Sequence, residues 1–260
     1  MIIFPKTIAL LKRSFENMGE LTEFTGKVIK QFFIRPYEHK ELLKQSYSVG
    51  NKSLGLIAIT GFIMGLVLTI QSRPVMVKFG AESMIPGMVA VSLLREIGPV
   101  ITALLCAGKI SSGIGAEIGA MKVTEQIDAM EVSGTKPLGF VVASRVLATT
   151  MMVPLLVFFA DMFGLLGSFL AMNISSPFSF QLYIRSAFDM LAFIDIIPST
   201  IKSIFFGFFI GLIGAFKGYK AGLGTESVGV AANSAVVSAS LAIFIIDLIT
   251  VMVTNIFIQQ

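Results

Sequence analysis

The chain has 260 residues, of which 55% are hydrophobic and only 14% charged, and its mean hydropathy is +0.85. These values lie well outside the usual range of soluble domains, and several apolar runs are long enough to cross a bilayer. We therefore predict an all-α membrane protein with one transmembrane domain. The net charge is +4, and basic residues gathered on one side of the membrane explain it better than a nucleic-acid partner does.

The first predicted element is an amphipathic helix over residues 8 to 33. Polar residues such as Lys12, Glu16 and Lys27 fill one face. The other face is apolar at every third or fourth position and consists of Ile8, Leu11, Phe15, Met18, Leu21, Phe24, Val28 and Phe32. Such a helix is too polar to insert and is expected to lie in the membrane interface. The alternative is an amphipathic helix packed on a protein core.

Pro36 is expected to end this helix, and residues 37 to 48 are expected to form a second polar helix that leads into the membrane. Residues 1 to 50 are thus predicted to hold the interfacial helices, and residues 51 to 260 the transmembrane domain. Five apolar segments follow, each long enough to span a bilayer: 53–72, 83–107, 141–172, 196–216 and 235–258.

Polar segments separate these spans. Residues 108 to 137 are charged, residues 173 to 195 contain Pro177 and leave room for a surface helix, and residues 217 to 233 are rich in glycine. Lys202, near one end of the fourth span, is expected to snorkel to the interface.

The distribution of Lys and Arg predicts the orientation. With the N-terminus inside, fifteen of these residues lie on the inner side, and the outer side holds only Arg73, Lys78, Arg185 and Lys202. This is a strong positive-inside bias. It predicts a cytoplasmic N-terminus, a periplasmic C-terminus, and cytoplasmic segments at 108–137 and 217–233.

Residues 116 to 131 are the most unusual segment, because they are charged in a chain that is short of charge. Acidic residues alternate there with apolar ones at roughly helical spacing: Glu117, Glu125, Asp128 and Glu131 with Ile118, Met121, Ile127 and Met130. Such a segment cannot cross a bilayer, so we predict a helix at the cytoplasmic face between spans 2 and 3. A charged helix held by short connections suits docking into a groove of a partner; the alternative is a solvated connecting loop.

The same residues resemble a known family. The pattern Ala116-x-x-Gly119-x-Met121-Lys122-x-x-Glu125-Gln126-x-Asp128-Ala129 is similar to the signature of the MlaE permeases of ABC-type phospholipid transporters. The resemblance covers about residues 40 to 258 and includes Ser92–Pro99, Ala107–Lys109, Lys217–Tyr219 and Val228–Val237.

This resemblance implies a role for the segment as the coupling helix of an ABC permease, which inserts into a cleft on a separate ATPase. The implied coupling residues are Ala116, Glu117, Gly119, Met121, Lys122, Glu125, Gln126, Asp128 and Ala129. It also implies a homodimer in the bacterial inner membrane, with phospholipid as cargo. The implied partners are a P-loop ATPase subunit, a periplasmic MCE-type lipid carrier and a small cytoplasmic STAS-domain protein.

The chain lacks the phosphate-binding motif G-x-x-x-x-G-K-[ST], since Gly108-Lys109 is followed by Ile110 and has no upstream glycine at the required spacing. We therefore expect a permease that is not itself an enzyme, binds no cofactor, and depends on a partner subunit to bind ATP.

Arg95 and Glu96 lie inside the second span, where each charge costs about 2.5–3.5 kcal/mol to insert. Adjacent helical residues point about 100° apart, so the two are not expected to neutralise each other. Gly98-Pro99 is expected to kink or interrupt the helix just after them. They either form salt bridges that fix packing or line a lipid cavity in which Arg95 binds a phosphate headgroup. The resemblance implies a cavity lined by Leu68, Gln71, Val75, Met76, Phe79, Arg95 and Glu96.

Three minor features complete the candidates. Asp161 and Asp247 lie near membrane depth, without the Gly-x-Gly-Asp context of an aspartyl protease, and are expected to make packing hydrogen bonds or to lie near the interface. His39 is the single histidine, which argues against histidine-dependent catalysis or a His-rich metal site. Gly61-x-x-x-Gly65 matches a helix-dimer motif.

Two other function classes stay open. An ion-coupled secondary transporter of a lipid or small anion would use the intramembrane charges and need no ATPase. A membrane enzyme would need a catalytic constellation, and the sequence offers none.

Overall fold

The computed structural model describes residues 3–33, 39–175 and 177–258, with backbone alone for 3–15, 17, 175, 193, 194, 257 and 258. In these ranges every regular element is helical. In chain order they are α1 (Ile3–Phe32), α2 (His39–Lys78), η1 (Glu82–Met84), α3 (Ile85–Ser92), η2 (Leu93–Ile97), α4 (Gly98–Cys106), η3 (Ala107–Ser111), α5 (Ser112–Val123), α6 (Gln126–Val132), η4 (Leu138–Ala143), α7 (Ser144–Ser175), α8 (Phe180–Asp189), α9 (Phe193–Tyr219) and α10 (Thr225–Ile258).

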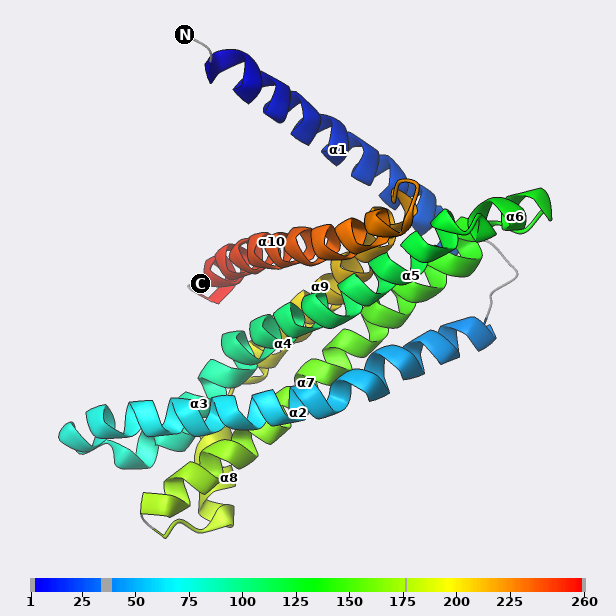
Figure 1. Ribbon diagram of the computed structural model, residues 1–260. Helices are drawn as coiled ribbons and strands as arrows, with labels where there is room; N and C mark the ends of the chain where they lie inside the picture. Colours follow the sequence, from blue (N-terminus) through cyan, green and yellow to red (C-terminus); the bar gives the residue numbers. More distant parts are fainter. Residues whose placement is uncertain (1–2, 34–38, 176, 259–260) are drawn as a thin grey trace.

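Five helices are long and apolar enough to cross a membrane, as the sequence predicted. They are His39–Lys78, Glu82–Val123, Leu138–Ile174, Asp195–Tyr219 and Thr225–Ile256. The second and third are composite: η1 to α5 follow one another without a loop, and so do η4 and α7. Figure 1 shows the bundle, with α5, α6 and the α9–α10 turn at one end and the α2–α3 turn and α8 at the other. We call these the α6 end and the α8 end.

Two predicted boundaries are wrong. Residues 39 to 48 do not form a separate polar helix but the first turns of α2, which runs unbroken for 40 residues. Likewise, the helix of the second span does not end near residue 107 but continues through residues 108 to 123. Neither stretch contains a proline, so every backbone N–H there can donate along the helix. Pro36 and Tyr37 lie outside the described residues.

Both composite helices contain π turns, which are rare and usually no longer than a single turn. They are η2, η3 and η4. Proline supplies a cause at two of them. Pro99 lies two residues after the end of η2 and has no N–H to donate to the preceding turn, and Pro137 directly precedes η4. The interruption expected at Gly98-Pro99 is therefore confirmed as a local change of helix type.

The main core lies between α2, α4, α5, α7 and α9, and a smaller core forms at the α8 end. The smaller core is centred on Leu93, Met172 and Tyr183, all with no exposed surface. Tyr183 comes from α8, which confirms the surface helix expected between spans 3 and 4. Burial raises the pKa of its phenol.

Gly61 and Gly65 let α2 approach α7 within the same chain. A Cβ at Gly61 would collide with the backbone of Ala160, and one at Gly65 would collide with the carbonyl oxygen of Gly164. The glycines therefore allow a close helix contact, and it is made within one chain. Both glycines are already buried by α7.

The second half of α1 packs on the bundle. Phe24 and Val28 are buried, and the Phe24 ring lies edge-to-face against Phe216 with centroids 5.4 Å apart. Glu20 forms an ion pair with Lys220 at the end of α9. The side chains of Ile8, Leu11 and Phe15 lie outside the described residues. The alternative of a helix packed on protein thus holds for this half, and the interfacial placement of the first half stays a prediction.

Candidate functional site

The predicted coupling segment forms two helices instead of one. Ala116, Glu117, Gly119, Met121 and Lys122 belong to α5, whereas Gln126, Asp128 and Ala129 belong to α6. Between them Glu125 adopts a left-handed conformation with φ 57°, and it is the sole non-glycine residue with positive φ in the described ranges. This conformation costs a non-glycine residue roughly 1–2 kcal/mol. The turn at Glu125 redirects the chain and sets α6 off from the span.

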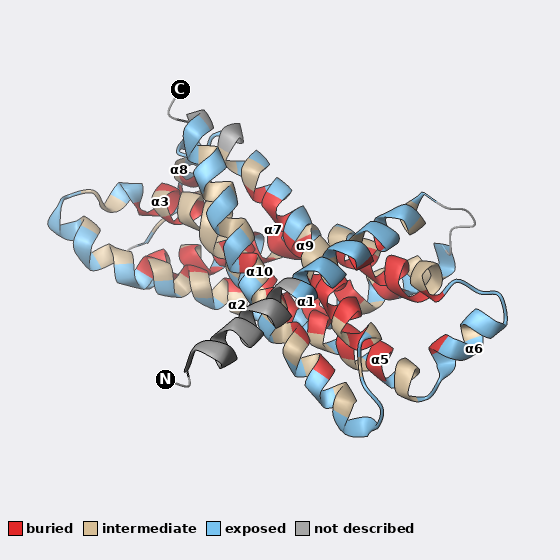
Figure 2. Cartoon of the chain, turned by 90° about the horizontal axis from the view of Figure 1, so that it is seen from above, coloured by how far each residue is buried: buried red, intermediate tan, exposed pale blue. Residues whose placement is uncertain are grey.

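Three contacts hold α6 in place. Ile127 is fully buried in the main core. The Lys122 ammonium donates to Asp128 Oδ1 at 2.7 Å, and the Tyr219 hydroxyl donates to Glu131 Oε1 at 3.2 Å. The opposite side of α6 stays exposed, as Figure 2 shows, and carries Glu125, Gln126, Asp128 and Ala129.

The α5 half of the segment is packed against the bundle. Gly119 is buried, and a Cβ there would lie 3.4 Å from the Cβ of Ala221. Glu117 accepts two hydrogen bonds from Arg145 of α7, from Nη2 at 2.7 Å and from Nε at 3.2 Å. Arg145 also donates from Nη1 to the carbonyl of Val141 at 2.8 Å. The segment therefore divides into a buried anchor on α5 and an exposed face on α6.

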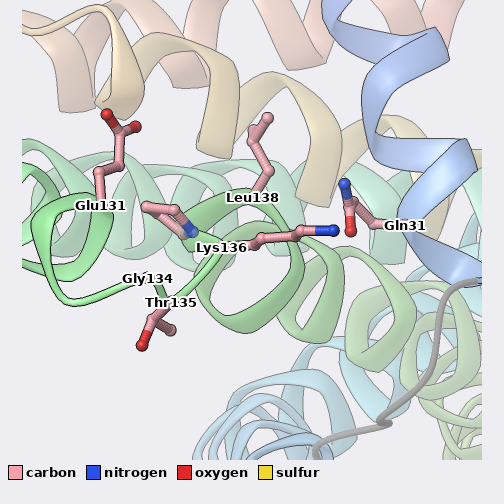
Figure 3. A pocket seen from close by; sticks show the side chains of 7 residues that line it. Gln31, Glu131, Gly134, Thr135, Lys136 and Leu138 are labelled. Carbon is pink, nitrogen blue, oxygen red and sulfur yellow. The ribbon is translucent and has the colours of Figure 1, made fainter.

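Two apolar side chains at the α6 end were not singled out from the sequence. Val132 at the end of α6 and Leu223 in the α9–α10 turn are almost fully exposed. Neither residue has an apolar neighbour directly before or after it in the sequence, and this isolation could have identified both. Figure 3 shows a nearby pocket of about 280 Å³ where α1, α6 and η4 meet, with Lys136 extended toward Gln31.

The charges at membrane depth are paired between helices. Arg95 Nη1 lies 3.7 Å from Asp195 Oδ1, whereas Lys202 Nζ lies 2.6 Å from Glu96 Oε2 and 3.1 Å from Asp247 Oδ1. Arg95 and Glu96 thus contact different partners, as their angular separation predicted. The snorkelling expected of Lys202 is wrong, because its side chain is only 2% exposed and is held by two carboxylates. Asp247 makes the packing contact expected of it.

The seven residues implied to line a lipid cavity fall into three settings. Leu68 and Met76 pack on the small core at the α8 end. Arg95 and Glu96 are in the salt bridges just described. Gln71 and Val75 are exposed along the last turns of α2, and Phe79 is exposed directly after its end. Arg73, beside them, is bound to Glu82 at 2.9 Å.

No three His, Cys, Asp or Glu side chains of the described ranges are arranged to hold a metal ion. The features that stand out are therefore the exposed face of α6 and the intramembrane salt bridges.

Comparison with known proteins identifies the family of the chain. A family model described as "Permease MlaE" matches residues 42–253. A probable ABC transporter permease protein of Rickettsia typhi is 36% identical over 230 residues, 88% of this chain and 89% of the relative. One from Synechocystis is 33% identical over 231 residues, 89% and 88% of the two chains. The intermembrane phospholipid transport system permease protein MlaE of Haemophilus influenzae is 35% identical over 209 residues, 80% of each chain.

The family model spans all five long helices together with α6, and the relatives align over most of their length. The chain is a multi-pass membrane protein and belongs to the MlaE family of ABC transporter permeases.

Proposed function

We propose that this chain is the transmembrane subunit of an ABC transporter that moves phospholipid between the bacterial inner membrane and a periplasmic MCE-type carrier. ATP is hydrolysed by a separate P-loop subunit, and two copies of the chain form the permease. The printed name of the Haemophilus relative, which identifies a phospholipid transport permease, supports the choice of cargo. A small cytoplasmic STAS-domain protein is a further expected partner.

The exposed face of α6 carries the proposal that an ATPase docks at this end. This face presents Glu125, Gln126, Asp128 and Ala129, while Ile127 fixes the helix from below. A rigidly held helix can pass movement of a docked partner to the bundle, because its contacts reach α5 through Lys122 and α9 through Tyr219. The α6 end then faces the cytoplasm, as the positive-inside count predicts.

The cargo half of the proposal rests on the exposed end of α2. Val75 and Phe79 are apolar and exposed beside Gln71. Two copies of the chain facing each other would enclose these side chains in an apolar cavity suited to acyl chains. The last span also leaves surface for a second copy: 11% of its most apolar stretch is buried within the chain, compared with 50% for α9.

The alternative is an ion-coupled secondary transporter. It requires intramembrane charges that bind and release an ion, but Glu96 and Asp247 share Lys202 in close contacts of 2.6 and 3.1 Å. Dependence on a docked ATPase separates the two functions.

The test is the substitution Glu125→Lys, which reverses a charge on the exposed face of α6 without touching the buried anchor. We expect normal membrane insertion and at least an approximately tenfold loss of co-purified ATPase, because like charges across an interface disfavour binding. Asp189→Lys is the matched control, since Asp189 is an exposed acid on α8 at the other end. Unchanged ATPase recovery with Glu125→Lys, or equal loss with both variants, contradicts the docking assignment.

A further inference from the structure

A cavity of about 240 Å³ lies between α7, α8 and α9, apart from the α6 face and the end of α2. Its walls are largely apolar, with Leu94 of η2 and Phe158 of α7 among them. Phe158 and Phe188 line it and are themselves exposed, so it is reachable from outside the bundle. At about 30 Å³ per water molecule, the volume equals roughly eight waters. It holds a small polar group and a few carbon atoms, but not a whole phospholipid.

Asp161 is the one charged residue among the described residues that line this cavity. The residue is 8% exposed, and no group of the described residues donates a hydrogen bond to its Oδ1. The carboxyl packs against the backbone of Gly98, where an added Cβ would collide with Oδ1. Oδ1 itself has almost no accessible surface, so a ligand in the cavity meets the carboxyl at its other oxygen. A buried carboxyl without a donor is costly, so a ligand that brings a donor gains that interaction. The hydrogen bond expected of Asp161 from the sequence is thus absent from Oδ1.

The other polar groups of the wall also offer acceptors. Thr200 Oγ1 donates to the carbonyl of Ile196 at 3.0 Å, and Ser203 Oγ donates to the carbonyl of Thr200 at 2.7 Å. Their protons are therefore used within α9, which leaves oxygen lone pairs for a ligand. Ser199 also lines the cavity, and it is the one lining hydroxyl without a hydrogen bond in the described residues. The wall therefore offers more acceptors than donors, and a molecule that donates hydrogen bonds fits it best.

The charge balance selects a cationic donor. Asp161 has no ion pair within the described ranges, because Lys202 is held by Glu96 and Asp247 and Arg95 lies by Asp195. Counted together, two basic and four acidic side chains meet in this part of the bundle. An ammonium group offsets this excess, whereas a neutral hydroxyl does not.

We infer that the cavity beside Asp161 binds a primary aliphatic ammonium group, carried either by a free alkylamine or by the ethanolamine headgroup of a lipid. The Asp161 carboxyl accepts from the ammonium, the α9 hydroxyls provide further acceptors, and the apolar wall receives the first carbons of the chain. This binding does not depend on phospholipid being the transported cargo, so its test is independent of the ATPase experiment.

The chain contains no tryptophan, so a single introduced tryptophan reports on this cavity alone. Phe188→Trp places the fluorophore in the cavity wall, and Phe180→Trp is the matched control. Both residues lie on α8 and are 53% and 52% exposed, but Phe180 does not line the cavity. The full-length protein in phosphatidylcholine nanodiscs is titrated with bromohexylamine, bromohexanol or bromohexane, and quenching is measured.

With Phe188→Trp we expect saturable quenching by bromohexylamine at about tenfold lower concentration than by bromohexane, as one hydrogen bond to a charged group provides. Asp161→Asn should remove this difference, and Thr200→Leu, which fills the cavity, should do the same if the asparagine variant is unstable. If phosphatidylethanolamine in the nanodiscs weakens the quenching by bromohexylamine, the lipid headgroup is the occupant. If it does not, the occupant is a free alkylamine.

The inference is overturned if bromohexylamine and bromohexane quench alike, if both Asp161→Asn and Thr200→Leu leave the difference intact, or if Phe180→Trp gives the same saturable signal. Equal quenching by bromohexanol and bromohexylamine overturns the assignment of an ammonium group.

Discussion

At the scale of single residues, Arg145 and Glu117 form one ion pair in two different environments. Arg145 is 4% exposed, and Glu117 is 52% exposed. A charge left unpaired in a buried site costs far more than one left in contact with solvent. Loss of Glu117 is therefore expected to cost more stability than loss of Arg145, although both substitutions remove the same two hydrogen bonds between them.

This asymmetry predicts that Glu117→Ala destabilises the protein more than Arg145→Met. The first substitution leaves a buried guanidinium with the Val141 carbonyl as its remaining partner and should cost about 3 kcal/mol or more. The second replaces a buried cation by an apolar side chain and leaves Glu117 hydrated. Thermal unfolding of the two variants in detergent measures the difference, and the reverse order would refute this account.

Sequence reasoning located most charged residues but not their partners. The position of Arg95 and Glu96 inside a span was enough to predict that they face different neighbours. It did not identify Lys202, which lies 106 positions beyond Glu96. A snorkelling lysine and a buried lysine have the same local sequence, and the contact depends on how η2, α9 and α10 pack.

At the scale of elements, the close contact between α2 and α7 depends on glycine. Gly61 and Gly65 face the α7 backbone, whereas Gly55 on the same helix has nothing near the position of a Cβ. Glycine is therefore required for packing at position 65, whereas at position 55 it only lowers the stability of the helix.

We expect Gly65→Ala to lower the melting temperature clearly, because the new methyl group meets a backbone carbonyl that cannot move aside. Gly55→Ala should be neutral or stabilising by about 0.5–1 kcal/mol, as alanine is in a helix interior. Melting curves with size-exclusion chromatography separate packing from dimerisation. If Gly65→Ala changes the oligomeric state but not the stability, the glycines belong to an intermolecular contact.

The five spans and the surface helix α8 followed from hydropathy and length, whereas helix ends did not. Residues 39–48 and 108–123 are polar enough to resemble loops, yet they continue α2 and the second span. Hydropathy locates the part of a helix that suits a bilayer, while hydrogen bonding decides where the helix stops. The break at Glu125 was missed because glutamate gives no local signal for a left-handed turn.

At the scale of the whole molecule, Lys202 connects three spans. It joins Glu96 of η2, its own helix α9, and Asp247 of α10. Removing the lysine would leave two carboxylates at membrane depth without a cation, which is costly in an apolar surrounding.

Lys202→Met should therefore destabilise the protein by about 3 kcal/mol or more. The triple variant Glu96→Gln, Lys202→Met, Asp247→Asn should recover most of that loss, because none of these three positions then carries an unpaired charge. Unfolding temperatures of the single and triple variants give the comparison. If the triple variant is as unstable as the single one, unpaired charge does not explain the loss of stability.

The π turn η2 contains Arg95 and Glu96, and η3 lies between them and the α6 end. If either changed to α-helical hydrogen bonding with no change in sequence, the helix beyond it would advance by about 1.5 Å and rotate by about 100°, the increments of one residue. The span Glu82–Val123 could therefore shift and rotate by one residue at either π turn without unfolding. The double hydrogen bond of Arg145 to Glu117 lies beyond both π turns and would have to break for such a rotation.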